Sequence, residues 1–480
     1  MKNLYLILCI ILTSFVMKAQ TSVDALRYSQ KKIAGTAKYV SMGGAFSALG
    51  ADISCLTTNP AGLGVYRSSE FTITPSFYMS DAMSEYQNLK YSDVKYNFNF
   101  GNIGLVFNNK IPDRLEANKW KSVSFGFGYN KLNNFNERII TEGYNNSSSI
   151  LDEWQLRANG SNAEDLSPFD TQLAYDTWLI DTLGSNTNYT TAMNSYGQLQ
   201  RKSLTAKGGI SQFNFSFGAN YDDRIYLGAG VGFTSLRYVE DGIYVEDDVK
   251  DAIYDFKSLK VEDYLKTTGA GIDFKVGVIY RAQDWLRLSA AFHTPTFYAM
   301  EDEYNRTISS SFDNGDGYEA SSPSGNFEYA MTTPFKAIGG MAFVINKIAI
   351  ISTEYEYSDV SETRFREDNT DYFDVNNSIK RSYDSQHNLR CGTEINLNPI
   401  SLRLGFAYST SPYKTNILNN GETFVYSAGI GYREKNFFID LAYQLYNKTE
   451  KYYLYNENLA PPFETKYTNS LIAFTFGYKF

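Results

Sequence analysis

The sequence ends in Thr468–Phe480, TNSLIAFTFGYKF, and this stretch decides the fold class. Every second residue from Ile472 to Phe480 is apolar or aromatic, whereas the intervening positions carry small or polar side chains such as Ala473 and Lys479. Successive side chains of a β-strand point to opposite faces. The stretch therefore predicts a strand that is apolar on one face and small or polar on the other.

The same alternation recurs along the chain from Glu70 onward. We count about fourteen such runs of about ten residues each, an even number within the range of outer-membrane barrels. The clearest further examples are 213–221, 272–280, 286–292, 402–408 and 437–445. A soluble β-sandwich also alternates, so the alternation alone leaves two fold classes open.

The connections between the runs decide between these classes, because short and long ones alternate. The short ones are 222–223, 282–284, 346–347, 396–399 and 433–436, with a modest one at 109–119; the long ones are 80–94, 139–211, 241–268, 301–326, 366–386, 411–422 and 451–467. An up-and-down barrel has turns at one rim and loops at the other. We therefore predict an all-β, antiparallel, up-and-down transmembrane β-barrel of about 14 strands over residues 69–480.

Composition agrees with a strand protein that spans a membrane. The 480 residues include 39 Tyr and 33 Phe, carry a net charge of -9, and have a mean hydropathy of -0.35. Such a charge argues against a nucleic-acid partner, and the hydropathy argues against a bundle of membrane helices. Aromatic residues near strand ends are expected at the two membrane interfaces, namely Tyr78, Tyr129, Tyr221, Tyr280, Tyr408, Tyr432 and Tyr478.

The first residues predict export. Lys2 precedes the apolar run Leu4–Leu12, and a small residue, Ala19, follows shortly after it. This is typical of a secretory signal over residues 1–19, although an uncleaved anchor is the alternative. The expected location is the outer membrane of a Gram-negative cell. There Phe480 resembles the carboxyl-terminal signal that the outer-membrane assembly machinery reads. The two cysteines beyond the signal, Cys55 and Cys391, can pair in an oxidising compartment, but we expect free thiols.

Residues 20–68 lack alternation and differ from the barrel. Ser41–Ala51, SMGGAFSALGA, is small and apolar; the residues that we expect to pack closely are Gly43, Gly44, Ala45, Phe46 and Leu49. The motif Asn59, Pro60, Ala61 and Gly62 follows. Many Gly and Ala residues permit close backbone approach, as a plug in a narrow lumen requires. The alternative is an arm that packs elsewhere on the barrel.

The run Gly35–Phe71 resembles the N-terminal hatch of the FadL/TodX family, outer-membrane transporters of long-chain fatty acids and aromatic hydrocarbons. The family's Asn-Pro-Ala motif matches Asn59, Pro60 and Ala61. The segments 293–295 and 333–335 resemble later family positions. The resemblance implies a hatch-plugged, fourteen-stranded barrel for hatch-gated uptake of hydrophobic small molecules. It also implies a lumen pocket beside the hatch and a sideways exit through a kinked strand, for which Gly126–Gly128 is a candidate.

The long loop 139–211 contains two candidate helices. Ser149 followed by Asp152 is typical of a capped helix start, and Ser167-Pro168 is typical of a second. The candidate residues for ligand capture on these helices are Trp154, Phe169, Leu173 and Trp178. Either the helices form an apolar landing site at the barrel mouth, or they pack on each other to close the loop.

Catalytic and metal chemistry find little support in the sequence. The chain has only two histidines, His293 and His387, and neither has a serine or carboxylate near it at a spacing typical of a catalytic site. No metal-ligand spacing is present, and the acidic runs 246–248 and 313–317 are expected to be solvated loops rather than calcium sites. We therefore expect a monomer without enzymatic activity or cofactor, whose partners are a hydrophobic ligand and outer-membrane lipids. The rival functions are a general porin and a surface adhesin or structural barrel.

Overall fold

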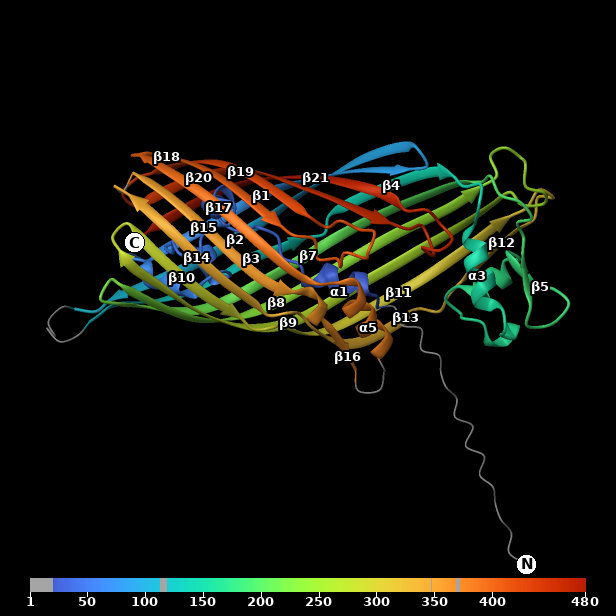
Figure 1. The fold of residues 1–480 in the computed structure, drawn as a ribbon, viewed down its shortest axis with the longest axis horizontal. Coiled ribbons are helices and arrows are strands. Elements are labelled where there is room, and N and C mark those ends of the chain that lie inside the picture. Colours follow the sequence, from blue (N-terminus) through green and yellow to red (C-terminus); the bar gives the residue numbers. More distant parts are fainter. Residues whose placement is uncertain (1–19, 113–118, 347, 368–371) are drawn as a thin grey trace, which may run out of the picture.

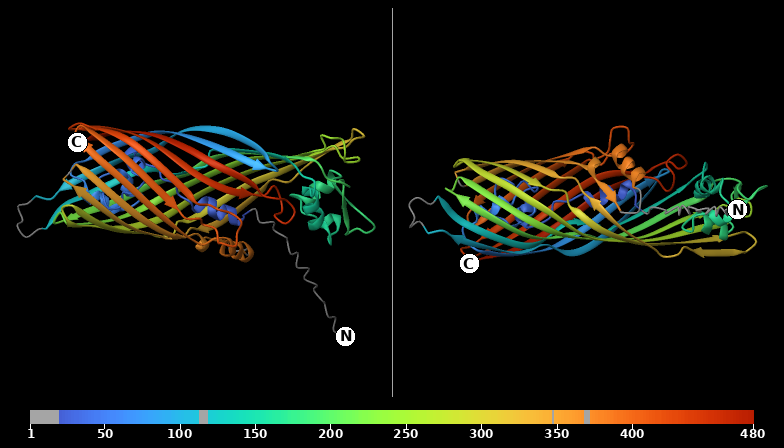
Figure 2. Two further views of the ribbon diagram at one scale, coloured as in Figure 1. Left: turned by 45° about the horizontal axis from the view of Figure 1, so that its top comes forward. Right: turned by 90° about the horizontal axis from the view of Figure 1, so that it is seen from below.

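A computed structural model describes residues 20–112, 119–346, 348–367 and 372–480. The predicted export signal, residues 1–19, lies outside these ranges. The chain forms a closed antiparallel barrel of 14 strands. The strands are tilted and wrap into a long cylinder, and the first helices lie inside it (Figure 1; Figure 2). The prediction of an up-and-down barrel is confirmed.

Several barrel strands are interrupted, and the two halves of each pair with the same neighbour. The barrel strands are, in chain order, β1 (Glu70–Tyr86), β2 (Leu89–Lys110), β3 (Trp120–Asn134) continued by β4 (Glu137–Tyr144), β7 (Leu199–Tyr221), β8 (Ile225–Asp247), β9 (Ser258–Gln283), β10 (Leu286–His293) continued by β11 (Phe297–Ser311), β13 (Gly325–Thr332) continued by β14 (Lys336–Ile345), β15 (Ala349–Asp359) with the short β16 (Arg364–Arg366), β17 (Ser385–Leu397), β18 (Ile400–Ser409), β19 (Thr423–Arg433), β20 (Phe437–Tyr452) and β21 (Phe463–Lys479). The extra strands are β5 (Ile180–Thr182) and β6 (Tyr189–Thr191), which pair with each other, and β12 (Gly317–Ser321), which pairs with β11.

The last strand closes the barrel. β21 pairs with β1 from Glu70 opposite Lys479 to Glu85 opposite Glu464, and on its other side it pairs with β20. Ile472 and Phe474 face outward and are exposed, whereas Ala473 is buried. The alternation of the final stretch is therefore the division between the lipid-facing and lumen-facing sides of the wall.

Two neighbouring strands break at the same level, at 294–296 and 333–335. Pro295 and Pro334 stand in these breaks, and proline cannot donate to a strand ladder. Threonine side chains repair the gap, because the backbone N–H of Thr296 donates to Thr333 Oγ1 at 2.9 Å. The segments that resemble family positions are thus the paired interruptions of the wall.

The short connections lie where the sequence predicts them, and we call that end the turn rim. The predicted long connection at 80–94 is wrong, because β1 and β2 continue to a tight turn at Gln87 and Asn88, both with positive φ. β7, β8 and β9 likewise reach 23, 23 and 26 residues, although about ten suffice to cross a bilayer. Beyond the apolar belt their outer face carries exposed charges such as Arg201 and Arg237, whereas Tyr238 and Tyr244 are buried inside, so the belt pattern does not mark their full length.

Apolar and aromatic side chains form a belt on the outside of the wall. Tyr280, Tyr432 and Tyr478 are exposed there, as predicted for interfacial residues. Tyr78 contradicts the prediction, because it is only 7 % exposed and points into the lumen. Within the described residues, no helix is both long and apolar enough to cross a membrane.

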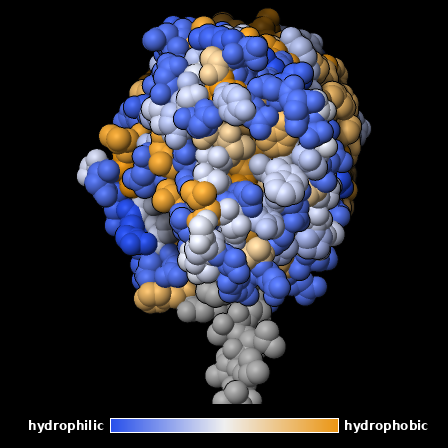
Figure 3. All heavy atoms as spheres, turned by 90° about the vertical axis from the view of Figure 1, so that its right-hand side faces the viewer, coloured by the Kyte–Doolittle hydropathy of each residue, from blue (hydrophilic) through white to orange (hydrophobic). Residues whose placement is uncertain are grey.

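The long loop folds into a small cap at the opposite end, the loop rim (Figure 1). It contains α3 (Ile150–Ala158) and α4 (Thr171–Asp176) around an apolar core. The helix start at Ser149 is confirmed, with Asp152 completing the capping box. The second helix begins after Asp170 rather than at Ser167-Pro168. Figure 3 views this end, where hydrophilic residues cover most of the surface around hydrophobic patches.

Replacing Trp154 with Ala is expected to loosen the cap while leaving the barrel closed. Trp154 is 1 % exposed in the cap core, and truncating a buried Trp costs about 3–5 kcal/mol. Limited proteolysis should cut the Trp154→Ala cap rapidly, whereas heat-modifiable migration on gels should persist. The matched control is Trp178→Ala, since Trp178 is 55 % exposed. Equal digestion rates for both variants would contradict the packing described here.

Candidate functional site

Residues 20–68 lie inside the barrel, and we call this segment the plug (Figure 2). Its helical turns are α1 (Ser22–Ser29), α2 (Ala37–Ser41), η1 (Ile53–Leu56) and η2 (Pro60–Val65). Of the two placements that the sequence left open, the structure has the one in the lumen. The residues expected to pack closely do so, since Gly43, Gly44, Ala45, Phe46 and Leu49 are all buried.

The Asn-Pro-Ala-Gly motif fixes the plug both to itself and to the wall. The Asn59 side chain donates from Nδ2 to Ser47 O at 2.9 Å and to Val278 O of β9 at 3.3 Å. Its Oδ1 accepts from the Ala61 N–H at 3.1 Å and so caps η2, in which Pro60 occupies the first position. Asn59 is 1 % exposed, so each of these polar atoms depends on its partner.

Wall glycines allow the plug to approach the strands closely. A Cβ on Gly277 would lie 2.0 Å from Asn59 Oδ1, and one on Gly228 would lie 2.2 Å from the Ala61 nitrogen. A Cβ on Gly405 would lie 2.1 Å from the nitrogen of Gly43. No larger residue fits at these positions with the plug in place.

Polar groups on the lumen side of the wall hold plug backbone groups. Glu354 accepts from the N–H groups of Phe46 (3.2 Å) and Ser47 (2.8 Å) and pairs with Arg390. His293 faces the lumen, as predicted, with Nε2 2.6 Å from Thr58 O. It is 4 % exposed and therefore serves as a packing contact with the plug. Within the described residues, no group of three His, Cys, Asp or Glu side chains is placed to hold a metal.

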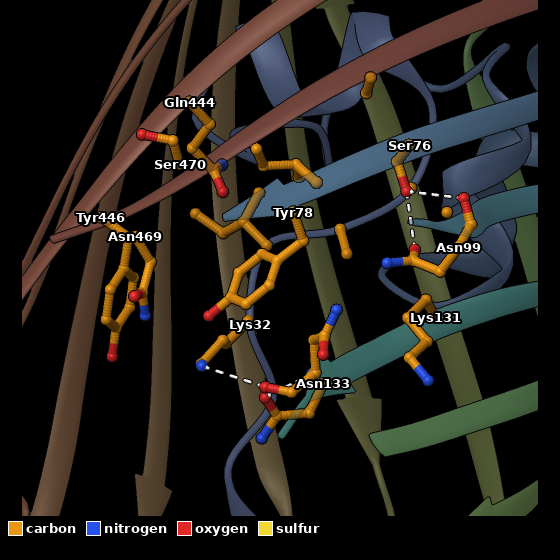
Figure 4. Close-up of a pocket in the computed structure, with 17 residues that line it drawn as sticks. Lys32, Ser76, Tyr78, Asn99, Lys131, Asn133, Gln444, Tyr446, Asn469 and Ser470 are labelled. Atoms are coloured by element: carbon orange, nitrogen blue, oxygen red, sulfur yellow. Dashed lines mark hydrogen bonds between the residues drawn. The ribbon is translucent and has the colours of Figure 1, made fainter. Parts of the chain in front are cut away.

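A narrow cavity of about 40 Å³ lies beside the plug (Figure 4). Its apolar and aromatic lining comes from Ile33, Ala34, Tyr78, Tyr446, Leu471 and Ala473, and its amide lining from Asn99, Asn133, Asn134, Gln444 and Asn469. Lys32 and Lys131 also line it, whereas none of the described lining residues is an Asp or Glu. The cavity therefore combines an apolar surface with positive charge, in a chain whose net charge is -9.

A second cavity of about 70 Å³ lies on the other side of plug residues 29–33. Its lining includes Lys336, Glu356 and Arg390, which form ion pairs with one another. Because these charges are paired and the surface is polar, this second cavity suits water better than an apolar ligand.

The backbone hydrogen-bond ladder of the wall is interrupted beside the first cavity. β2 pairs with β3 only from Asn102 to Lys110, so Leu89–Gly101 has a ladder partner in β1 alone. On the other side, the register of β3 shifts between Lys131 and Asn133, and the strand breaks before β4. We call this gap, between Leu89–Gly101 and Lys131–Tyr144, the seam. The kink is therefore not at Gly126–Gly128, whose ladder with β2 and β7 is regular.

Side chains rather than backbone bonds bridge the seam. Tyr91 donates to Glu142 at 2.6 Å, and Asn134 donates to Asn97 at 3.1 Å. Outward-facing aromatic residues of the belt flank it on β2, namely Tyr96, Phe98 and Phe100. Asn99, Gly101, Lys131, Asn133 and Asn134 line both the seam and the cavity, so the two are continuous.

The candidate capture residues divide into two groups. Trp154 and Leu173 are buried in the cap core, and Phe169 packs against Tyr304 with tilted rings whose centroids are 4.7 Å apart. Trp178 is exposed and lines a shallow groove with Tyr318. The cap thus matches the alternative in which the helices pack to close the loop.

The family resemblance implied a lumen pocket and a sideways exit, but sequence reasoning did not identify the residues of the cavity or of the seam. The polar run Lys131–Asn136, KLNNFN, was the available signal, because it breaks the alternation in the middle of a predicted barrel strand. Cys55 in the plug and Cys391 in β17 are both free thiols in this structure.

Comparison with known proteins supports the fold. No protein-family model matches the sequence, and no curated protein matches it. A Pseudomonas aeruginosa FadL homologue is 12% identical with a TM-score of 0.56, covering 94% of this chain and 100% of its own. The Pseudomonas putida toluene transporter TodX is 12% identical (TM-score 0.54; 94% and 99% covered), and the Ralstonia pickettii toluene transporter TbuX is 14% identical (TM-score 0.51; 93% and 99% covered). The chain therefore has the fold of the FadL/TodX-type transporters.

Replacing Gly277 with Val is expected to unseat the plug, because the new side chain meets Asn59. Cys55 reports the change: it is buried, and burial raises the pKa of its thiol well above the usual value, so a maleimide should label it slowly in the native protein. In a Cys391→Ser background, Gly277→Val should speed labelling by about tenfold or more. Gly339→Val is the matched control, since a Cβ there meets nothing within 4 Å. Unchanged labelling of Gly277→Val would contradict the seating described here.

Proposed function

We propose that this chain is an outer-membrane channel for the uptake of hydrophobic small molecules. The observation that supports it most strongly is the continuity of the lumen cavity with the seam, at the level of the apolar belt. A ligand in the cavity has a short path through the wall toward lipid, while the plug blocks the path toward the turn rim. On this proposal the turn rim faces the periplasm, and residues 20–68 are the hatch.

A sideways exit follows from the energetics of apolar solutes. Each methylene gains about 0.8 kcal/mol when it leaves water for an apolar surrounding. A long acyl chain therefore favours lipid over periplasmic water. Amide side chains at the seam, such as Asn97 and Asn134, supply partners in a part of the wall where the ladder is missing.

The two lysines favour a ligand with an acidic head group. Lys32 contacts the rings of Tyr78 and Tyr446, at 5.8 and 5.3 Å from their centroids, and Lys131 lines the same cavity near the seam. A carboxylate placed between them would find two ammonium donors without a competing acid in the cavity wall. We therefore propose a long-chain fatty acid rather than a neutral aromatic hydrocarbon. The similar structures include toluene transporters, so both ligand classes belong in the test.

The rival functions make different demands on the same lumen. A general porin needs a water-filled bore, whereas here a plug with buried anchors such as Asn59 and Phe46 occupies it. An adhesin or structural barrel has no use for a cavity beside a gap in the wall. An enzyme would need an available general base, but His293 is held against the plug backbone.

Locking the seam is expected to stop uptake. The side chains of Asn97 and Asn134 already meet across it, so Asn97→Cys with Asn134→Cys should form a disulfide on oxidation, in a background with Cys55 and Cys391 replaced by Ser. Cellular uptake of radiolabelled oleate should fall on oxidation and return on reduction.

The matched control for the lock uses the same two strands where the ladder is intact. Asn108 and Ser124 are ladder partners with a 2.8 Å side-chain hydrogen bond, so Asn108→Cys with Ser124→Cys crosslinks the strands without closing a gap. Oxidation of this pair should leave uptake unchanged. If the oxidised 97–134 pair still takes up oleate at the native rate, the sideways route is wrong.

Removing the cavity lysines is expected to weaken the binding of acidic ligands but not that of neutral ones. A hydrogen bond to a charged group contributes about 1.5–3 kcal/mol, so Lys131→Met or Lys32→Met should weaken oleate binding by about tenfold or more. Toluene binding should change little. Calorimetric titration of the detergent-solubilised protein measures both. Lys207→Met is the control, because that side chain is 58% exposed away from the cavity. Equal losses for oleate and toluene would contradict the assigned head-group site.

A further inference from the structure

Two arginines face each other on the lumen side of the wall at the turn rim. Arg281 of β9 and Arg287 of β10 are direct cross-strand partners, next to a register shift at Leu286. Their side chains share the inward face with Ser289 and His293, which contact the plug. Like charges placed directly opposite each other destabilise a strand pair. Their juxtaposition therefore calls for a compensating negative charge.

The carboxylates of the described chain do not supply that charge. Arg281 pairs with Asp284 at 3.0 Å, but the Asp284 side chain is 95% exposed. Arg287 has no carboxylate partner among the described residues; its Nη1 donates to Leu49 O of the plug at 2.8 Å. Arg67, a third arginine near Arg287, is paired with Asp223 at 2.7 Å. The cluster thus keeps an excess of positive charge.

Both arginines also have an N–H donor without a partner among the described residues. Within the described residues, the Nε atoms of Arg281 and Arg287 are buried and have no hydrogen-bond partner. Buried N–H groups without a partner are rare in folded proteins, so each requires an explanation. A guanidinium presents its donors as a planar fork that matches the oxygens of a carboxylate or phosphate.

We propose that Arg281 and Arg287 form a binding site for an oxyanion, a carboxylate or a phosphate, at the turn-rim face of the plug. The anion bridges the two guanidinium groups, accepts from their free donors and cancels their repulsion. Because Arg287 also holds Leu49 O, the bound anion steadies the plug where it meets β10. This site lies across the plug from the lumen cavity, so it does not depend on the proposed function.

Thermal unfolding of the purified full-length protein tests the site, because the effect of an arginine substitution on Tm should differ between chloride and an oxyanion. In chloride at low ionic strength, Arg281→Gln should raise Tm, because it removes like-charge repulsion. In potassium phosphate or acetate at matched ionic strength, the native protein should gain stability in a saturable way. Arg281→Gln and Arg287→Gln should bind these anions about tenfold or more weakly. Decanoate, compared with acetate, distinguishes an amphipathic carboxylate from a free anion, and phosphate distinguishes a phosphate source.

Arg224→Gln is the matched control, since Arg224 is an exposed arginine of the adjacent turn. It should keep the full response to phosphate and acetate. The inference is overturned if native protein responds to these anions no more than to chloride, or if Arg281→Gln and Arg287→Gln respond as Arg224→Gln does. Hydration of the two Nε atoms alone would give this null result.

Discussion

The pairing of β1 with β21 is the constraint on which the rest of the structure depends. In an apolar surrounding every backbone N–H and C=O must find a partner, and a sheet achieves this only by closing on itself. Closure assigns each side chain to the outside or to the lumen. The outside becomes an apolar belt, while the lumen face carries glycines and buried polar groups that accept the plug. Gly277, Glu354 and His293 have a role only because the plug lies against them.

Between β2 and β3 this constraint is relaxed at the seam. Its edge lacks ladder bonds over Leu89–Gly101, and polar side chains from both sides partly replace them. Local departures from regular structure tend to mark functional positions. The gap lies beside the cavity, and on the proposed function this position links the geometry of the wall to a path for a ligand.

Sequence reasoning succeeded for features that are set by residues close together in the chain. Alternation predicted the strands, turn spacing predicted the barrel, and the Ser149 capping box predicted α3. The interruptions at Pro295 and Pro334 were visible as motifs, although not as paired breaks. The seam and cavity depend on how distant strands are registered, and the run Lys131–Asn136 marks only the place where β3 is interrupted. Tyr78 failed because its residue type was weighed without its place in the alternation: it lies on the same inward face of β1 as Thr74 and Ser80.

Ion conductance across a planar lipid bilayer tests the central account most directly, namely that a closed barrel is blocked by its own N-terminal segment. The account predicts that the full-length protein inserts without steady conductance, and that a protein lacking residues 20–66 conducts ions through an open bore. Steady, porin-like conductance of the full-length protein, equal to that of the truncated one, would contradict it.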